Sequence, residues 1–335
     1  MNNLYDVIVV GGGPTGLACA IEAKRLGLTH LVLEKGCVVN SLLNYPVNMV
    51  FFTTPELLEI GDIPMVSQRE KPTRQEALKY YRLVAQHFQL KIHQYELVEG
   101  IQGSDGRFEV LTRTAHSGPG CYHARKVIFA TGYYDIPNPL GVPGEELPKV
   151  SHYYREAHAY YDCDVAVIGG RNSAAEAALD LYRHGARVTL IHRDAALSDK
   201  IKYWVKPDIE NRVKKGEIQA LFETEVVEIR PDRIVIQAAG TNFAGKETRT
   251  LPNDFVFALT GYRPDSEFLQ RAGVHIEPKR MHPEYNPKTL ETNVPGLYLA
   301  GVIIGGLDTS EIFIENGRFH GKVVVADIAA KLKKG

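Results

Sequence analysis

The spacing of apolar residues changes twice near the start of the chain. Apolar residues dominate positions 5–10, three glycines follow at 11–13, and LACAIEAKRLG then places apolar residues at the spacing of one helix face. A second apolar run, HLVLE, ends at Glu34. Short apolar runs bounded by glycine are typical of buried strands, whereas a period of about 3.6 residues indicates a helix. The pattern therefore predicts a strand, a glycine turn, a helix and a second strand.

The same succession returns in the middle of the chain. DVAVIGG predicts a strand that ends in a glycine turn, NSAAEAALDLYRHG predicts a helix, and ARVTLIHR predicts another strand. His192 follows Gly169 at the same spacing that separates Glu34 from Gly11. A repeated unit of strand, glycine turn, helix and strand predicts two copies of one nucleotide-binding fold.

Each glycine of the first turn has its own steric task. Gly11 permits the tight turn, Gly13 lets a pyrophosphate approach the backbone, and Gly16 lets the helix pack closely on the strand. The free N–H groups at the helix N-terminus favour a phosphate. Glu34 is placed to accept hydrogen bonds from the hydroxyl groups of an adenosine ribose and to repel a 2′-phosphate. The first copy therefore predicts a site for FAD or NAD and not for NADP.

The second copy carries the opposite charge after its second strand. His192 and Arg193 replace the acidic residue, and a cation at this place suits the 2′-phosphate of NADPH. Arg171 stands where the middle glycine is expected, and its guanidinium is able to bind the pyrophosphate directly. Ala174 replaces the third glycine, which is a tolerated variant of the motif. The second copy therefore predicts an NADPH site; the alternative is that both copies are packing motifs that bind no nucleotide.

Later segments predict how the two copies are joined. KVIFATGYYDIP at 126–137 and FVFALTGYRPD at 255–265 each predict a buried strand that ends in a Thr-Gly turn. VPGLYLAGVI at 294–303 predicts another strand, and the segment from Glu311 onwards predicts a closing helix. The predicted fold class is α/β, with two Rossmann-like dinucleotide-binding domains. The expected division is a discontinuous FAD-binding domain at 1–150 and 266–335, with the NADPH-binding domain inserted at 151–265.

Composition and charge argue against several other classes of protein. The chain has 335 residues and a formal net charge of −1 with no long run of one sign, so neither nucleic acid nor an anionic membrane is the expected partner. No apolar run has the length of a signal peptide or a membrane span, and a cytoplasmic protein is expected. The four cysteines form no CxxC pair or zinc spacing, and the twelve histidines form no HExxH motif. No metal site is predicted.

Longer parts of the sequence resemble a known family. The order of GGGPTG, FATG, VIGGRNSA, LTG and LYLAG resembles the two-domain flavoproteins of the low-molecular-weight thioredoxin reductase type over nearly the whole chain. NYPVNMVFFTT, KYWVKPDIENRVKKG and EIFIENGRFHG are more specific and resemble the YpdA-type enzymes, which are proposed bacillithiol disulfide reductases. The resemblance implies FAD and NADPH as cofactors, a small-molecule disulfide or a small redox protein as electron acceptor, and a homodimer.

Two sets of cofactor-binding residues are predicted. For FAD they are Gly11, Gly13, Pro14, Thr15, Gly16, Glu34, Lys35, Ala130, Thr131, Gly132, Gly301, Val302, Glu311 and Ile312. For NADPH they are Gly169, Gly170, Arg171, Asn172, Ser173, Ala174, His192, Arg193, Lys202 and Gly261.

The chain departs from these relatives at residues that carry their chemistry. Thioredoxin reductases have a CxxC dithiol shortly before the second glycine strand, where this chain has His152 and Arg155. In the YpdA-type enzymes the proposed reactive cysteine lies in the first glycine turn, at the position of Thr15. The catalytic residue is therefore unknown, and the candidates are Cys19 as a thiol near a helix N-terminus and His152 as a general acid. A buried, inert cysteine and an exposed linker histidine are the alternatives.

Val302 is a further departure. Many flavoproteins of this architecture have an aspartate directly after the last Ala-Gly, where it contacts the ribityl chain or the flavin phosphate. Here Ala300 and Gly301 are followed by Val302. Backbone N–H groups of this turn are expected to replace the carboxylate.

Four functions remain open. The favoured one is an FAD-dependent reductase that passes electrons from NADPH to a low-molecular-weight disulfide such as bacillithiol disulfide. The second is an NADP reductase for ferredoxin or flavodoxin, because thioredoxin-reductase-like enzymes of that kind also lack the dithiol. A flavin monooxygenase ranks lower, since the segment before the second glycine turn lacks the FxGxxxHxxxWP pattern. The last is a redox sensor that binds both cofactors without turnover.

Overall fold

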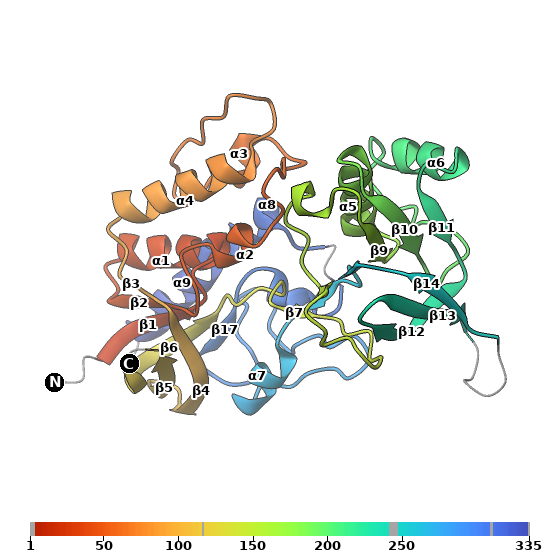
Figure 1. The fold of residues 1–335 in the computed structure, drawn as a ribbon. Coiled ribbons are helices and arrows are strands. Elements are labelled where there is room, and N and C mark those ends of the chain that lie inside the picture. Colours follow the sequence, from red (N-terminus) through yellow and green to blue (C-terminus); the bar gives the residue numbers. More distant parts are fainter. Residues whose placement is uncertain (1–3, 116, 241–246, 309–310, 334–335) are drawn as a thin grey trace. The chain divides into compact units, whose positions relative to one another are not determined.

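A computed structural model describes residues 4–115, 117–240, 247–308 and 311–333, and these form two compact units (Figure 1). The first unit combines the residues up to Leu43, Met49–Ile136 and those from Tyr262 onwards. The second combines Asn44–Asn48 and Pro137–Gly261. The first unit is thus discontinuous and the second is inserted into it, as the sequence predicts.

The boundaries of the units differ from the predicted divisions near 151 and 265. Strands β7 (Ile136–Pro137) and β16 (Tyr262–Arg263) pair with each other where the chain passes between the units. Residues 137–150 belong to the second unit because β8 (Val150–Ser151) is an edge strand of its sheet. Asn44–Asn48 joins the same unit, where the Val47 N–H donates to the carbonyl oxygen of Arg155 at 2.8 Å. No short-range pattern of apolar residues signals that contact.

The first unit is built on a seven-stranded sheet in the order β3-β2-β1-β6-β5-β4, with β17 also paired to β6. One side of β6 pairs in parallel with β1. On its other side, residues 118–124 pair with antiparallel β5 and residues 127–129 pair with parallel β17. The strands are β1 (Leu4–Val10), β2 (His30–Glu34), β3 (Ile92–Gln94), β4 (Glu96–Ser104), β5 (Arg107–Thr114), β6 (Gly118–Phe129) and β17 (Leu297–Leu299).

Alternation along β1 separates two layers of core. Val7 and Val9 pack in one cluster with residues of helices α1 (Pro14–Arg25) and α9 (His320–Leu332). Ile8 and Val10 face the other side and pack with residues of β4, β5 and helix α7 (Ser266–Arg271). Successive strand side chains point to opposite faces of a sheet, so β1 contributes to both layers. The remaining helices of this unit are α2 (Asn40–Leu43), α3 (Pro55–Leu58), α4 (Arg74–His87) and α8 (Ile314–Gly317).

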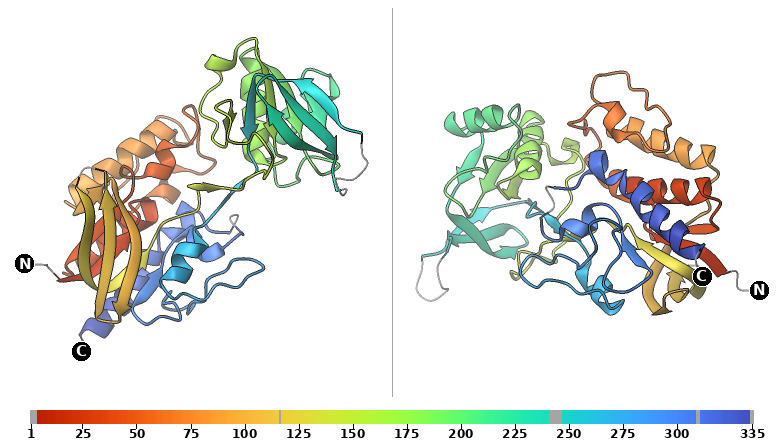
Figure 2. Two further views of the ribbon diagram at one scale, coloured as in Figure 1. Left: turned by 60° about the horizontal axis from the view of Figure 1, so that its bottom comes forward. Right: turned by 180° about the vertical axis from the view of Figure 1, so that it is seen from behind.

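Helices α1 and α9 lie side by side on one face of the sheet (Figure 2). Their close approach requires Gly321, since a Cβ at that position would lie 2.9 Å from the carbonyl oxygen of Ala18. The prediction of one closing helix from Glu311 is wrong, because the helical residues form α8 and α9 as separate helices. Gly317 at the end of α8 approaches the first glycine turn, since a Cβ there would lie 3.2 Å from Oγ1 of Thr15.

The second unit contains a five-stranded parallel sheet in the order β11-β10-β9-β15-β8 and a three-stranded antiparallel sheet in the order β12-β13-β14. Its helices are α5 (Asn172–Arg183) and α6 (Lys206–Lys214), with a 3₁₀ turn at His158–Tyr160. Its other strands are β9 (Asp164–Ile168), β10 (Arg187–Ile191), β11 (Gln219–Leu221), β12 (Thr224–Arg230), β13 (Arg233–Ala238), β14 (Arg249–Pro252) and β15 (Phe255–Ala258). Within the described ranges, no helix combines the length and the apolar character that crossing a membrane requires.

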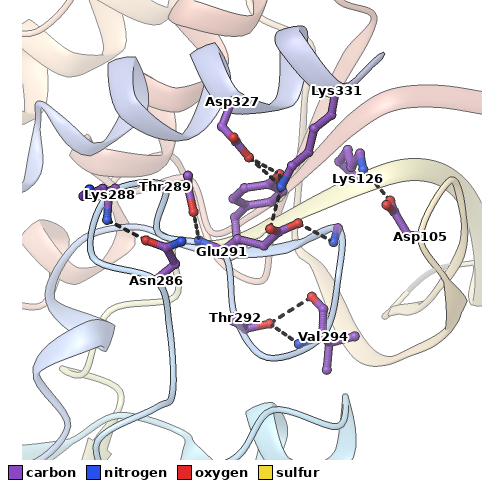
Figure 3. A network of polar contacts seen from close by, with 12 residues as sticks. Asp105, Lys126, Asn286, Lys288, Thr289, Glu291, Thr292, Val294, Asp327 and Lys331 are labelled. Atoms are coloured by element: carbon purple, nitrogen blue, oxygen red, sulfur yellow. Dashed lines mark hydrogen bonds and ion pairs between the residues drawn. The ribbon is translucent and has the colours of Figure 1, made fainter. Parts of the chain in front are cut away.

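A polar network attaches α9 to the sheet of the first unit (Figure 3). The hydroxyl of the fully buried Tyr298 on β17 donates to Asp327 at 2.7 Å, and Lys331 donates to that hydroxyl at 3.1 Å. Lys331 also pairs with Asp327 at 2.8 Å and with Glu291 at 2.5 Å. Burial and the hydrogen bond to Asp327 raise the pKa of Tyr298, so the phenol stays protonated as the donor.

Replacing Tyr298 with phenylalanine is expected to lower the free energy of unfolding by about 1–2 kcal/mol, because it removes a buried hydrogen bond to a charged group and keeps the ring. Urea denaturation of the purified protein measures the change. Tyr95→Phe is the control, since the Tyr95 side chain is 63% exposed. Equal stability of Tyr298→Phe and the parent protein would show that the network does not stabilise α9.

Candidate functional site

The first glycine turn lies between β1 and α1 and needs glycine at two positions. Gly11 has a left-handed φ of +107°, and a Cβ there would lie 2.5 Å from the carbonyl oxygen of Ala130. A Cβ on Gly16 would lie 2.0 Å from the carbonyl oxygen of Gly11. At Gly13 a Cβ would meet no atom within 4 Å, and no side chain caps α1. The turn is therefore open at Gly13, beside unshared N–H groups, and this geometry fits a pyrophosphate.

Glu34 ends β2 and holds the turn through both carboxylate oxygens. Its Oε2 accepts from the N–H of Gly12 at 2.6 Å, and its Oε1 accepts from the N–H of Gly36 at 2.7 Å. Burial raises the pKa of Glu34, and the N–H donors of Gly36 and Gly12 oppose that shift. A carboxylate oxygen has two lone pairs, so Glu34 retains acceptor capacity for a ribose hydroxyl. The neighbouring Lys35 is paired with Asp135 at 3.1 Å.

The turn at Ala130 to Gly132 meets the glycine turn at the end of β6. The Ala130 N–H donates to the carbonyl oxygen of Val10 at 2.8 Å, and the space around Gly132 is open. The buried Oγ1 of Thr131 has no hydrogen-bond partner in the described part of the chain. A buried hydroxyl without a partner is unfavourable, and a polar atom of a bound cofactor would satisfy it. This hydroxyl and the open side of Gly13 are the observations that make the first unit fit FAD.

The turn after β17 closes on the start of α1. A Cβ on Gly301 would lie 3.1 Å from Oγ1 of Thr15, and one on Gly317 would lie 3.2 Å from the same oxygen. The N–H of Gly301 donates to Nδ1 of His320 at 2.9 Å. Gly317 and His320 were not among the predicted site residues. The segment GRFHG was singled out only as part of a resemblance, and nothing local in it indicates a contact with Gly301.

The other predicted FAD residues lie around this turn in the first unit. Val302 begins a 3₁₀ turn (Val302–Gly305) and is half-buried. Glu311 is exposed, and its carbonyl oxygen accepts from Nδ2 of Asn316 at 2.9 Å. Ile312 packs against the core cluster that contains β17. Their contacts with FAD stay predictions.

The second glycine turn reproduces the first. Gly169 has a φ of +145°, and a Cβ there would lie 2.5 Å from the carbonyl oxygen of Leu259. Its N–H donates to the carbonyl oxygen of Ile191 at 3.0 Å, as the N–H of Gly11 donates to that of Leu33 at 2.8 Å. Ala174 is buried in place of the third glycine, at 3.1 Å from a Cβ built on Gly169. The repeat predicted from the sequence is thus a repeat in three dimensions.

His192 lies directly against the second turn. A Cβ on Gly170 would lie 2.2 Å from Nε2 of His192, which is 3.1 Å from Oδ2 of Asp194. Burial lowers the pKa of His192, and the positive charges of Arg193 and Arg171 lower it further, whereas the nearby Asp194 raises it. These effects favour the neutral imidazole, so Arg193 is the permanent cation at this strand end, and a contact of His192 with the 2′-phosphate stays a prediction.

The N-terminus of α5 presents unpaired positive charge. Arg171 is its N-cap residue, and both Arg171 and Arg193 are exposed and without an ion pair among the described residues. Asn172 ties down the loop that follows, because Nδ2 donates to the carbonyl oxygen of Lys200 at 3.2 Å and Oδ1 accepts from the N–H of Lys202 at 2.9 Å. Nζ of Lys202 is paired with Glu176 at 2.7 Å. The two arginines are thus better placed than Lys202 to pair with a phosphate.

Two predicted NADPH residues remain, Ser173 and Gly261. Ser173 is exposed beside Asn172 in the first turn of α5. Gly261 has a left-handed φ of +93°, and its carbonyl oxygen accepts from the N–H of Asn138 at 2.9 Å. Nδ2 of Asn138 also donates to the carbonyl oxygen of Thr260 at 3.3 Å. Asn138 was not predicted, because it lies far in the sequence from Thr260 and Gly261, whose carbonyl oxygens it contacts.

The two candidate catalytic residues lie in different environments. The side chain of Cys19 is fully buried, and burial raises the pKa of its thiol to about 12, so it is not a reactive thiolate. His152 is 19% exposed; its Nε2 lies 3.2 Å from Glu145, and its Nδ1 lies 3.2 Å from the carbonyl oxygen of Ala258. It is held inside the second unit and is not an exposed linker histidine. Its role as a general acid stays a prediction.

The other cysteines are no better suited to nucleophilic chemistry. Burial raises the pKa of Cys37, Cys121 and Cys163, with nearby carboxylates acting in the same direction. All four cysteines are free. Among the described residues, no group of three or more histidine, cysteine or acidic side chains is arranged to hold a metal ion.

Comparison with known proteins identifies the family. The sequence profile of the pyridine nucleotide-disulphide oxidoreductases matches residues 8–301. The chain is 45% identical to the bacilliredoxin reductase Bdr of Bacillus subtilis (strain 168) over 97% of each chain. It superposes on the bacillithiol disulfide reductase Bdr (YpdA) of Bacillus cereus with a TM-score of 0.94 at 44% identity, covering 98% of this chain and 100% of the other. For the protein of the same name from Staphylococcus aureus the TM-score is 0.91 at 42% identity, covering 98% and 99%.

These matches confirm the predicted fold, the predicted cofactors and the resemblance to the YpdA-type enzymes. The chain belongs to the pyridine nucleotide-disulphide oxidoreductase family and is an NADPH-dependent flavoprotein oxidoreductase.

Proposed function

We propose that the protein reduces a low-molecular-weight disulfide of the bacillithiol disulfide type. The observation that carries this proposal is full-length similarity, at 42–45% identity, to enzymes named for bacilliredoxin or bacillithiol disulfide reduction. The FAD bound by such an enzyme takes two electrons from NADPH and passes them to the acceptor. Reduction of the disulfide breaks one S–S bond, consumes two electrons and two protons, and releases two thiols.

The chain's own residues contribute binding and orientation. We assign the turn at Gly11 to Gly16, with Glu34 and Thr131, to FAD, because it combines an open anion site with a partnerless buried hydroxyl. We assign the second turn, with Arg171 and Arg193, to NADPH, because two unpaired guanidinium groups flank it. The homodimer and the cytoplasmic location expected from the sequence also stay predictions.

The proposed reaction proceeds without a thiol of this chain. The dithiol of thioredoxin reductases is replaced by His152 and Arg155, and Thr15 has no sulfur. Burial raises the pKa of all four cysteines, so no thiolate of this chain is favoured at neutral pH. Bound FAD would then supply the electrons to the acceptor disulfide directly, or a thiol pair from a partner would carry them.

Anaerobic reoxidation tests the proposal. The holoenzyme is reduced with stoichiometric NADPH, bacillithiol disulfide is added, and the visible absorbance of oxidised flavin is followed. We expect rapid return of the absorbance, with two thiols released per NADPH, and the same rate in Cys19→Ala. Flavin that bleaches with NADPH but does not reoxidise with the disulfide would reject the proposed acceptor. Flavin that NADPH does not bleach would favour a sensor.

The second candidate acceptor is a small thiol protein of the bacilliredoxin type. It is favoured by the name of the Bacillus subtilis relative, which identifies that protein as a bacilliredoxin reductase. Adding an oxidised bacilliredoxin in the same assay separates the two cases. Faster reoxidation by the protein than by the free disulfide would make it the acceptor. Reoxidation by ferredoxin or flavodoxin alone would identify the other type of reductase.

A further inference from the structure

We propose that His320 is a pH-sensitive positioning residue of the FAD site, whose neutral imidazole holds the Gly301 turn against Thr15 and releases it on protonation. The proposal depends on the FAD site of the first unit and not on the identity of the acceptor. It is therefore independent of the proposed disulfide substrate.

The hydrogen bond to Gly301 sets the protonation state of His320. Nδ1 accepts from the N–H of Gly301 at 2.9 Å, so the neutral ring carries its proton on Nε2. Protonation adds a hydrogen to Nδ1 and places two donors opposite each other. The bond is then lost, and the N–H of Gly301 is left without its acceptor.

The Gly301 turn is clamped between elements that come from both ends of the chain. Gly301 has a left-handed φ of +82°, and a Cβ there would lie 3.1–3.2 Å from three atoms of the Thr15 side chain. Gly317, three residues before His320, packs on the same Thr15 oxygen. His320 therefore links the start of α9 to the turn after β17 through Gly301. That turn packs on Thr15, in the first turn of α1, next to the open anion site at Gly13.

This arrangement changes the role expected for the turn that lacks an aspartate. Backbone N–H groups were expected to replace the carboxylate at the position of Val302. The structure shows that the N–H of Gly301 is already used by His320. The imidazole thus takes over the task of ordering this turn, and it is a group that titrates near neutral pH, unlike a backbone amide.

Burial of His320 gives the pH dependence its direction. Burial lowers the pKa of His320 from its usual value, and it is the sole cause of that shift. The packed elements carry other charged residues, and none of them contributes to the shift. They are Glu22, Lys24 and Arg25 of α1, Glu315 of α8, Arg318 between α8 and α9, and Lys322, Asp327 and Lys331 of α9. No carboxylate therefore compensates an imidazolium. The contribution of His320 is fully present above its ordinary pKa and is lost as pH falls through the lowered one.

The test measures FAD affinity of the apoprotein by quenching of flavin fluorescence between about pH 5 and 8, the range in which histidine titrates. The parent protein is expected to bind FAD more weakly as pH falls. His320→Asn places Oδ1 near the position of Nδ1, so we expect parental affinity at pH 8. We also expect a weaker dependence on pH than in the parent, because an amide does not titrate while Glu34 still does. His320→Leu leaves the Gly301 N–H without a partner at every pH, so it is expected to bind FAD about tenfold or more weakly than the parent at pH 8, with a difference that narrows as pH falls.

His275→Asn is the matched control, because His275 belongs to the same unit and its side chain is 75% exposed. It is expected to keep the parental pH profile. The proposal is overturned if His320→Asn retains the parental dependence on pH, or if His320→Leu binds FAD as tightly as the parent at pH 8. If His320→Leu does not fold, the comparison of His320→Asn with His275→Asn decides alone. Turnover with any acceptor plays no part in this measurement, so failure here and failure of the proposed function are distinguishable.

Discussion

Alanine at position 13 is expected to weaken FAD binding by at least about tenfold without unfolding the protein, since the methyl group occupies the space that the pyrophosphate needs. Gly13 has a φ of −73°, which alanine adopts freely, and its added Cβ would meet no protein atom within 4 Å. The protein itself therefore gives no reason for glycine at this position. The dissociation constant of FAD and the thermal midpoint of the apoprotein are the two quantities to measure.

Two other glycines provide the controls for Gly13→Ala. A Cβ on Gly16 would lie 2.0 Å from the carbonyl oxygen of Gly11, so Gly16→Ala is expected to lower the thermal midpoint as well as FAD affinity. A Cβ on Gly100 would lie 3.9 Å from Leu111, an ordinary contact, so Gly100→Ala is expected to change neither. Unaltered FAD affinity in Gly13→Ala would show that the pyrophosphate does not approach this turn.

The parts of the fold that the sequence predicted well are those with local causes. The strand, glycine turn, helix and second strand of each copy depend on residues within one short stretch, and the structure places Gly11 and Gly169 in the same geometry. The discontinuous first unit also follows from the order of these motifs along the chain. Local spacing was therefore enough to predict the topology around both turns.

The errors arose where a contact joins distant parts of the sequence. The closing helix was expected to be continuous, but α8 ends at Gly317, which packs on Thr15, and α9 begins at His320. His320 was missed for the same reason, since its partner Gly301 belongs to a different element. The spacing of apolar residues within α8 or α9 does not indicate a contact with the other end of the chain.

Burial distinguishes the two cationic residues predicted for the second site. A sequence shows that His192 and Arg193 stand where Glu34 stands in the first copy, but it does not show that the His192 ring is packed on Gly170. Packing removes water from the imidazole and lowers its pKa, whereas Arg193 remains exposed and charged. Burial also decides the state of Cys19. A helix N-terminus favours a thiolate, but the thiol of Cys19 is completely buried, and burial raises its pKa.

Selectivity for NADPH over NADH should therefore depend on the arginines of the second site. Arg171 and Arg193 have no ion pair in the described part of the chain, while Lys202 is paired with Glu176 at 2.7 Å. A guanidinium pairs with a phosphate through charge-assisted hydrogen bonds that need no prior separation from a carboxylate. Arg193 follows the strand end at which the first copy has Glu34, the residue predicted to bind a ribose, so Arg193 is expected to meet the 2′-phosphate.

Replacing Arg193 with alanine is expected to raise the KM for NADPH about 10- to 100-fold and to leave the KM for NADH nearly unchanged, since NADH lacks the 2′-phosphate. Steady-state turnover with each nucleotide measures the two constants. Lys202→Met is expected to have a smaller effect on NADPH, because Lys202 must first leave Glu176. Arg183→Ala is the control, since Arg183 lies at the other end of α5 and is paired with Asp208. Equal losses with NADPH and NADH in Arg193→Ala would place Arg193 at the pyrophosphate, and Arg171 would then be the residue to test for the 2′-phosphate.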